Sequence, residues 1–308
     1  MNLQLQNSFL SNWISVDNME PVFVHLVQSW ISVLLITIII CFVVGEMTRN
    51  FSQVDKVWSL MPIAYSWITL SAFPSSPRLW LMTVLVTAWG FRLSYNFYRK
   101  GGYNIIPWKG EEDYRWGILR QNPILKKGIR ISLFNLFFIS IYQQVLIFLF
   151  STPLLLAAEY ADVSLTGLDY LAASFMFLFI LIETVADNQL YHFHLQKQHK
   201  MPVNGQFNES LNKGFMMEGL WKYVRHPNFA AEQATWVSFY FFGVIASGQW
   251  INWTLSGPLL LILLFAGSSG FTESISMGKY PEYMNYKQNV PRFLPVNLRL
   301  KQRAEKQV

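Results

Sequence analysis

Long stretches without a formally charged side chain recur along the chain, and they constrain its fold more than any other feature. Residues 22–44 form the first, which is long enough to cross the hydrocarbon core of a bilayer as a helix. Residues 131–158 form another, with Pro153 late in it. The sequence therefore predicts an all-α fold, a polytopic helical bundle embedded in a membrane.

Seven membrane spans are predicted, and the distribution of charge gives their orientation. The predicted spans are residues 22–44, 57–73, 79–98, 131–158, 168–186, 233–250 and 253–271. With the N-terminus outside, nearly all Lys and Arg residues fall on inner segments, and only Arg78 falls on an outer one. This asymmetry follows the positive-inside rule. We therefore expect an outer N-terminus and a cytoplasmic C-terminus.

Composition agrees with a membrane protein. Only 14% of the residues are charged, against about 25% in a typical soluble domain, and the mean hydropathy is +0.25. The net charge of +6 follows the orientation of the spans, so nucleic acid is not an expected partner. The expected partners are the bilayer and a hydrophobic lipid substrate, with no obligate protein partner. We expect a multi-pass protein of a bacterial inner membrane or an endoplasmic reticulum membrane.

One domain accounts for most of the chain. We assign residues 1–21 to an N-terminal extension, 22–296 to a single membrane domain and 297–308 to a polar C-terminal tail. The first apolar run is too long for a signal peptide and lacks a basic segment before it, so we expect it to be retained. The long inner loops place the mass outside the bilayer on the cytoplasmic face. Residues 279–289 are predicted to form a short interfacial helix.

The segment 218–232 is the most informative polar stretch, because it sets a basic, aromatic loop against a membrane helix that opens with a carboxylate. Pro227 suits the first turn of that helix. Asn228 and Glu232 are four residues apart, so both face the same way. A polar group at this depth is costly without a purpose. We therefore predict a polar ligand at the boundary between membrane and cytoplasm.

Arg225 and His226 lie just outside the same helix, within reach of an anion near its start. The alternative is a juxtamembrane anchor built from an aromatic belt and snorkelling cations. Such an anchor accounts for Trp221 and Tyr223 but leaves Glu232 unexplained.

A second pair of carboxylates, Glu183 and Asp187, lies four residues apart on one helical face. Two such groups repel unless one is protonated or a cation or hydroxyl lies between them. The alternative is an ion pair with Arg92. The nearby His192 and His194 do not share a helical face, and no metal site is predicted.

Further candidates carry weaker signals. Arg99, Lys100 and Arg115 are inner-loop cations, and the orientation of the spans accounts for any one of them alone. As a group they would clamp phosphates, since arginine binds them in a bidentate manner. Asp55 heads the second predicted span, where a carboxylate also serves as a helix N-terminal charge. Tyr283 and Tyr286 are three residues apart and line either a ligand or an interfacial aromatic helix. The sequence contains no Gly-x-Gly-x-x-Gly and no Walker loop, so a nucleotide would not be held by a Rossmann or P-loop fold.

Residues 219–232, with the core Tyr-x-Arg-His-Pro-Asn-Phe, resemble the C-terminal signature of the steroid 5-alpha-reductase superfamily. This superfamily includes sterol reductases and, more distantly, isoprenylcysteine carboxyl methyltransferase. The motifs Asp55-x-x-Trp58 and Trp89-x-x-Arg92-Leu93 resemble its uncharacterised multi-span branch. The resemblance covers residues 50–296.

This resemblance implies NADPH as the cofactor, held by the helical bundle and the cytoplasmic loops. Asn228 and Glu232 would hold its nicotinamide end, and the basic loop residues would meet its phosphates. The implied cofactor-binding residues are Arg92, Arg99, Tyr103, Arg115, Asp187, Tyr223, Arg225, His226, Asn228, Glu232, Tyr283 and Tyr286.

The resemblance also implies hydride transfer to a conjugated enone in an apolar cavity between spans one to four, with a donor that polarises the ketone. The steroid enzymes place a tyrosine near Gly90 or Trp89 and an acid near Leu60, and this chain has neither. Asp55, Tyr65 and Trp89 are the expected catalytic residues in their place. The alternatives are an S-adenosylmethionine-dependent methyltransferase of a lipidated substrate and a non-catalytic membrane lipid-binding protein.

Overall fold

The computed structural model describes residues 21–106, 108–125 and 128–296, and their regular secondary structure is entirely helical. Four helices are long and apolar enough to cross a membrane: α2 (Pro21–Thr48), the segment Gly128–Glu159, α10 (Gly167–Lys197) and Trp253–Lys279. The all-α fold predicted from the sequence is confirmed for this part of the chain. Residues 1–20 of the predicted extension and the predicted tail, 297–308, lie outside it.

Helices also occupy the other three predicted spans. They are α4 (Leu60–Ala72), α5 (Pro77–Arg99) and α12 (Pro227–Ser247). The second predicted span is interrupted, because a short helix α3 (Gln53–Trp58) ends at Ser59 and leaves α4 only 13 residues long. A helix of that length does not cross a bilayer by itself. Polar side chains in α5 and α12 lower their hydropathy, and these side chains form the site described below.

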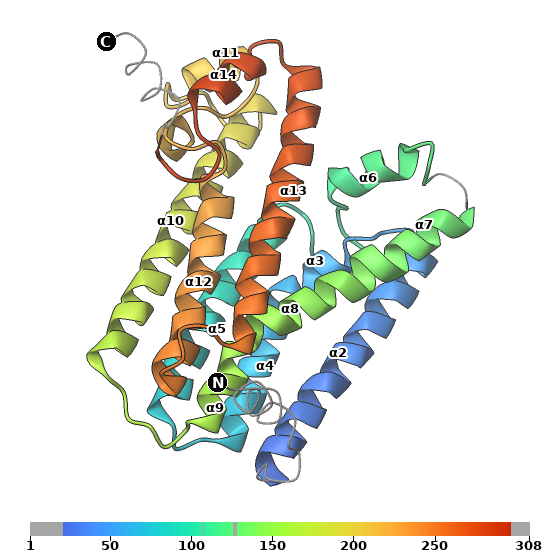
Figure 1. Cartoon of the computed structure of the whole chain (residues 1–308). Coiled ribbons are helices and arrows are strands. Elements are labelled where there is room, and N and C mark those ends of the chain that lie inside the picture. The colour runs from blue at the N-terminus through green and yellow to red at the C-terminus, as the bar shows by residue number, and fades with distance from the viewer. Residues whose placement is uncertain (1–20, 107, 126–127, 297–308) are drawn as a thin grey trace, which may run out of the picture.

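The segment Gly128–Glu159 runs obliquely across the molecule, from α2 toward the other long helices (Figure 1). It comprises α7 (Gly128–Phe134), a π-helix η2 (Asn135–Tyr142), α8 (Gln143–Ser151) and α9 (Pro153–Glu159). Pro153 begins α9, where its missing N–H is tolerated in the first turn. A π-helix is rare and frequent at functional sites, so η2 marks this part of the molecule for attention.

Aromatic side chains fill the space between α2, α4, α8 and α12. Trp30 stacks on Tyr65 with ring centroids 4.3 Å apart, and Phe148 meets both rings edge-on. Phe150 packs against Trp236 at 4.1 Å. Aromatic side chains of this size bury large apolar areas and dominate the packing energy. The region between the first four predicted spans is therefore a packed core.

A buried ion pair joins α5 to α10 at the end of the bundle away from α11 and α14. Arg78 Nε lies 2.7 Å from Asp169 Oδ1, and both side chains are fully buried. Two carbonyls, of Val163 and Ser164, accept further hydrogen bonds from the guanidinium. Asp169 also accepts from the backbone and hydroxyl of Thr166, which completes a capping box at the start of α10.

The opposite end carries the short elements. They are α6 (Tyr114–Gln121), α11 (Asn208–Lys213), η3 (Gly219–Lys222) and α14 (Tyr283–Asn289), which follows α13 (Ser256–Lys279). A 3₁₀ turn η4 (Trp253–Leu255) precedes α13 at the other end. Helices α11 and α14 lie beside the C-terminal ends of α10 and α13 (Figure 1). A helix was predicted at 279–289, and α14 confirms it in a shorter form.

Replacing Arg78 by Met would leave Asp169 buried without its partner and would weaken the capping box. Breaking a buried pair on one side costs about 3–5 kcal/mol of the free energy of unfolding. We expect a loss of this size in unfolding measured by detergent titration. Arg49→Met is the matched control, because Arg49 pairs with Glu46 and its side chain is 66% exposed. Exposed pairs contribute about 0–1 kcal/mol, so equal losses in the two variants would contradict the assignment.

Candidate functional site

Three buried carboxylates surround one guanidinium where α5, α10 and α12 meet. Arg92 Nη2 lies 2.8 Å from Glu183 Oε1, and Arg92 Nη1 lies 2.8 Å from Asp187 Oδ2. Glu232 Oε2 is 3.8 Å from Arg92 Nη2. The sequence left open whether Glu183 and Asp187 pair with Arg92, and the structure confirms that pairing. All three carboxylate residues also line a polar cavity of about 220 Å³.

Residues four apart on α5 and α12 bring amide groups to the same place. Asn96, one turn beyond Arg92, donates to Asp187 Oδ2 at 2.8 Å. Asn228, one turn before Glu232, donates to Asp187 Oδ1 at 3.3 Å. Since a helix repeats every 3.6 residues, each pair shares one face of its helix. Asp187 is therefore held by all three helices.

Two tryptophans fix the carboxylate of Glu232. The indole N–H of Trp89 donates to Glu232 Oε2 at 2.8 Å, and that of Trp236 donates to Oε1 at 3.0 Å. Both rings are fully buried and meet edge to face at 4.8 Å. Trp89, one of the expected catalytic residues, lines neither of the cavities described here and instead orients Glu232.

The charges and hydrogen bonds of this site are not balanced. Three carboxylates face one guanidinium, which leaves an excess of negative charge when all are ionised. Glu183 Oε2, Asn228 Oδ1 and Arg92 Nε are buried without a hydrogen-bond partner. Buried polar atoms are paired as a rule, so these atoms indicate a site made for a polar ligand. Within the described ranges, no group of three or more His, Cys, Asp or Glu residues is placed to hold a metal ion.

The lining of the polar cavity also includes four charged residues from outside the three helices' carboxylate cluster: Asp55, Lys100, Asp113 and Arg115. Arg115 donates twice to Asp113, at 2.8 Å each, and once to Ser268 at 2.7 Å. Burial by itself raises the pKa of Asp113, but the hydrogen bonds and charge of Arg115 prevail and lower it. Lys100 makes no hydrogen bond or ion pair with the described residues, so its ammonium is available to an anion.

The pKa of Asp55 shifts in the opposite direction to that of Asp113. Burial is the main cause that raises its pKa above the ordinary value, and the negative charge of Asp113 adds to it. The indole N–H of Trp116 donates to Asp55 Oδ2 at 3.1 Å and partly offsets these effects. A carboxyl group in this position tends to keep its proton.

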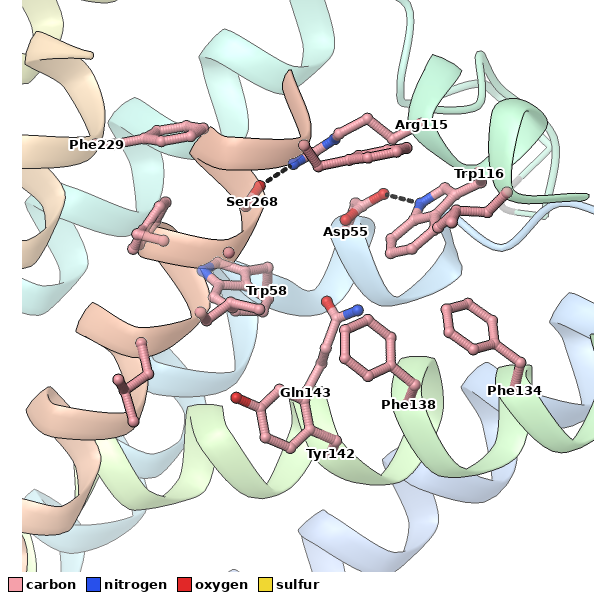
Figure 2. Close-up of a pocket in the computed structure, with 16 residues that line it drawn as sticks. Asp55, Trp58, Arg115, Trp116, Phe134, Phe138, Tyr142, Gln143, Phe229 and Ser268 are labelled. Atoms are coloured by element: carbon pink, nitrogen blue, oxygen red, sulfur yellow. Dashed lines mark hydrogen bonds between the residues drawn. The ribbon is translucent and has the colours of Figure 1, made fainter. Parts of the chain in front are cut away.

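An apolar cavity of about 520 Å³ lies between α13 and η2 (Figure 2). One wall is a ladder of stacked rings, in which Phe138 lies 5.0 Å from Phe134 and 5.5 Å from Tyr142. The polar and apolar cavities share part of their lining. The shared residues are Asp55, Trp58, Arg115, Phe229 and Phe265. A ligand in one cavity would therefore lie next to a ligand in the other.

The position of this apolar cavity differs from the one that the family resemblance implies. A lipid cavity was expected between spans one to four, but Trp30, Tyr65 and Phe148 fill that region. The cavity is bounded instead by α3, α6, α7, η2, α8, α12 and α13. Tyr65, another expected catalytic residue, is fully buried in the aromatic core and lines neither cavity. Of the three expected catalytic residues, Asp55 alone lines both.

Arg225 and His226 face Glu273, away from the carboxylates around Arg92. Arg225 Nε and His226 Nε2 lie 2.8 Å and 3.1 Å from Glu273 Oε1. Lys287 and Arg292 approach the other oxygen of this carboxylate at 3.2 Å and 3.5 Å. The backbone N–H of Arg225 donates to Pro291, and that of His226 to Arg292. These groups fasten the chain after α14 onto α12 and α13.

The remaining expected cofactor residues line neither cavity. Arg99 donates to Asn188 at 2.5 Å, and the hydroxyl of Tyr103 donates to the carbonyl of Lys56 at 2.7 Å. Tyr223 is exposed. Tyr283 and Tyr286 are buried against Phe215, and the hydroxyl of Tyr286 donates to the carbonyl of Trp221.

Some residues of the site were missed by sequence reasoning. Asn96 and Trp236 follow Arg92 and Glu232 by four residues, a spacing that signals a shared face. Trp58 appeared only as part of a motif. Phe229 and Phe265 carry no sequence signal beyond helical apolar spacing, because most such rings pack in a core.

Comparison with known proteins places the chain among uncharacterised relatives. A family model described as a protein of unknown function, DUF1295, matches residues 41–290. The uncharacterized protein C594.04c of Schizosaccharomyces pombe is 39% identical over 280 residues, covering 85% of this chain and 79% of the relative. No solved structure matches the chain at a significant level.

Arg92→Met and Glu183→Gln test the charge balance around the guanidinium. Removing Arg92 strands three buried carboxylates, so we expect a loss of about 3–5 kcal/mol in the free energy of unfolding. Glu183→Gln removes one excess negative charge and keeps the shape, so we expect little change or a gain. Detergent unfolding of both variants provides the measurement. A larger loss for Glu183→Gln than for Arg92→Met would exclude an excess of negative charge.

Asp55→Asn tests the protonation of Asp55. Because the folded pKa is raised, the folded protein binds more protons than the unfolded chain above the ordinary aspartate value of about 3.9. The stability that Asp55 contributes is then complete at low pH and is lost as pH rises through the folded pKa. We expect the difference in unfolding free energy between wild type and Asp55→Asn to fall with rising pH. A rising difference would contradict the assignment.

Proposed function

Since the chain belongs to the DUF1295 family, which is related to steroid 5-alpha-reductase-like proteins, we propose that it is an NADPH-dependent integral-membrane oxidoreductase. Its substrate in this proposal is a hydrophobic lipid with a reducible carbon–carbon double bond, of steroid, enone or isoprenoid type. One observation carries the proposal: a polar cavity facing the loop end of the bundle adjoins an apolar cavity, and the two share Asp55 and Trp58.

The residues of the polar cavity fit one end of the cofactor. Its volume of about 220 Å³ lies below the usual range of about 300–1,000 Å³ for a complete small ligand. It would therefore take the nicotinamide end, whose amide group matches the unpaired Asn228 Oδ1 and Glu183 Oε2. The phosphates would extend toward Lys100, because Asp113 and Ser268 already occupy the guanidinium of Arg115. Arg225 and His226 would contribute only by leaving Glu273, so we assign them to positioning of the chain after α14.

The mechanism assigns distinct tasks to the groups of the site. NADPH, when bound, would supply the hydride, and the carboxylates of Glu183, Asp187 and Glu232 would stabilise positive charge at that end of the cavity. Trp89 and Trp236 hold Glu232 in a fixed orientation, so its charge needs no reorganisation. Burial raises the pKa of Asp55, and this residue lies in the shared wall, where its protonated form would donate a hydrogen bond to an oxygen of the lipid.

We further propose that all seven predicted spans cross the membrane, the second by α3 and α4 together, with the N-terminus outside and the C-terminus in the cytoplasm. The charge asymmetry supports this orientation, in which Lys100 and Arg115 of the polar cavity would lie toward the cytoplasm. NADPH would then arrive from the cytoplasm and the lipid from the bilayer.

A second candidate is an S-adenosylmethionine-dependent methyltransferase of a lipidated substrate. The excess of negative charge around Arg92 favours it, because that cofactor carries a sulfonium cation. A non-catalytic lipid-binding protein would use the apolar cavity alone.

Thermal unfolding of the purified protein discriminates among these functions. A ligand that binds only the folded state, at 100 times its dissociation constant, stabilises it by about 2.7 kcal/mol. We expect NADPH to raise the unfolding temperature of wild type and not of Asn228→Ala. Glu209→Gln, in the exposed pair with Lys213, is the control and should respond like wild type. A shift with S-adenosylmethionine and none with NADPH would favour the methyltransferase, and no shift with either would favour lipid binding alone.

A further inference from the structure

The apolar cavity contains a buried amide without a partner. Gln143 is only 5% exposed and begins α8, directly after the π-helix η2. Its side chain points from α8 into the cavity toward Asp55 (Figure 2). No hydrogen bond joins this amide to any other group in the described part of the chain. The next residue, Gln144, points elsewhere and contacts Cys41 Sγ at 3.7 Å.

Two more polar groups face the same cavity. The hydroxyl of Tyr142 and the indole N–H of Trp58 belong to lining residues, and neither has a hydrogen-bond partner among the described residues. An otherwise apolar pocket with a few convergent polar groups is the usual form of a small-molecule site, in which the polar groups fix orientation. Gln143 both donates and accepts, so it matches a carbonyl or hydroxyl oxygen.

The charges around the cavity favour a neutral oxygen over an anion. Arg115 is the cation in its lining, and Asp113 and Ser268 already occupy its guanidinium. Asp55 lines the same cavity as Gln143 and supplies no positive charge to it (Figure 2). A carboxylate or phosphate in this cavity would therefore find no available cation.

The rim of the cavity is apolar and exposed. Leu263 on α13 is 65% exposed and Phe138 on η2 is 39% exposed, and both line the cavity. In a membrane these faces lie against lipid. A hydrocarbon tail would pass between α13 and η2, with its polar end reaching Gln143 and the wall shared with the polar cavity.

We propose that Gln143 is a specificity-determining residue that binds the carbonyl oxygen of a neutral, amphipathic lipid entering sideways between α13 and η2. This inference rests on the proposed function, which makes the carbonyl end of the lipid the end that reacts. The bound oxygen would then lie beside the wall between the two cavities, which contains Asp55 and Trp58. The recognised class is a lipid aldehyde or ketone, with lipid acids and plain hydrocarbons excluded.

Binding of a matched isoprenoid series to the full chain in lipid nanodiscs tests the inference without NADPH. The probes are farnesal, an aldehyde; farnesene, a hydrocarbon of the same length; and farnesoate, an acid. We expect wild type to bind farnesal about tenfold more tightly than either other probe, the effect of one hydrogen bond to a buried amide. Gln143→Met, which keeps the shape, should bind farnesal and farnesene equally. Gln144→Met is the control and should keep the wild-type ratio.

Equal binding of farnesal and farnesene by wild type would overturn the inference even if the variants do not fold, as would failure to bind either probe. An unchanged ratio in Gln143→Met would also overturn it. The proposed function can fail separately. If NADPH gives no stabilisation but the farnesal preference depends on Gln143, the lipid-binding site is supported and the proposed reductase activity is contradicted. If NADPH stabilises the protein and wild type shows no preference for farnesal, only the proposed role of Gln143 is contradicted.

Discussion

The interaction on which the centre of this protein depends is the burial of the Arg92 guanidinium among carboxylates. A charge inside a helical bundle is tolerated only when it is paired and hydrogen-bonded. Arg92 meets this requirement by contacting Glu183 and Asp187 on α10 and approaching Glu232 on α12. The pairing draws three helices together, and it leaves more negative charge than one guanidinium neutralises. The same constraint that packs the helices thus creates a polar cavity with unsatisfied groups.

Three arginines, Arg78, Arg92 and Arg225, lie largely buried in different parts of the bundle, and their roles differ. Arg78 is saturated by Asp169 and two carbonyls, which closes the end of the bundle away from α11 and α14. Arg225 is saturated by Glu273 and by carbonyls near α14. Arg92 alone among these three has a buried N–H group without a hydrogen-bond partner. That difference separates structural arginines from one that belongs to a site.

The sequence was a good guide to the helices and a partial guide to the site. Uncharged runs identified the helical stretches, and spacing of four placed Asn228 with Glu232 on one face. It was a poorer guide to direction, because a position near a helix start does not say which neighbour a side chain meets. Arg225 therefore turned out to face Glu273 on α13. Likewise, the polar character of Tyr65 gave no sign that Trp30 stacks on it within the core.

Arg78 is the basic residue that the predicted orientation leaves on an outer segment, and the structure accounts for it. In that orientation it departs from the positive-inside pattern, yet its charge is paired with Asp169 and fully buried. Without Arg78, no Lys or Arg falls on a predicted outer segment. In that predicted orientation Lys100 and Arg115, which line the polar cavity, belong to the basic side. A soluble anionic ligand and a lipid would meet at one wall, which contains Asp55 and Trp58. In the proposed function, the reaction between the soluble cofactor and the lipid would take place at that wall.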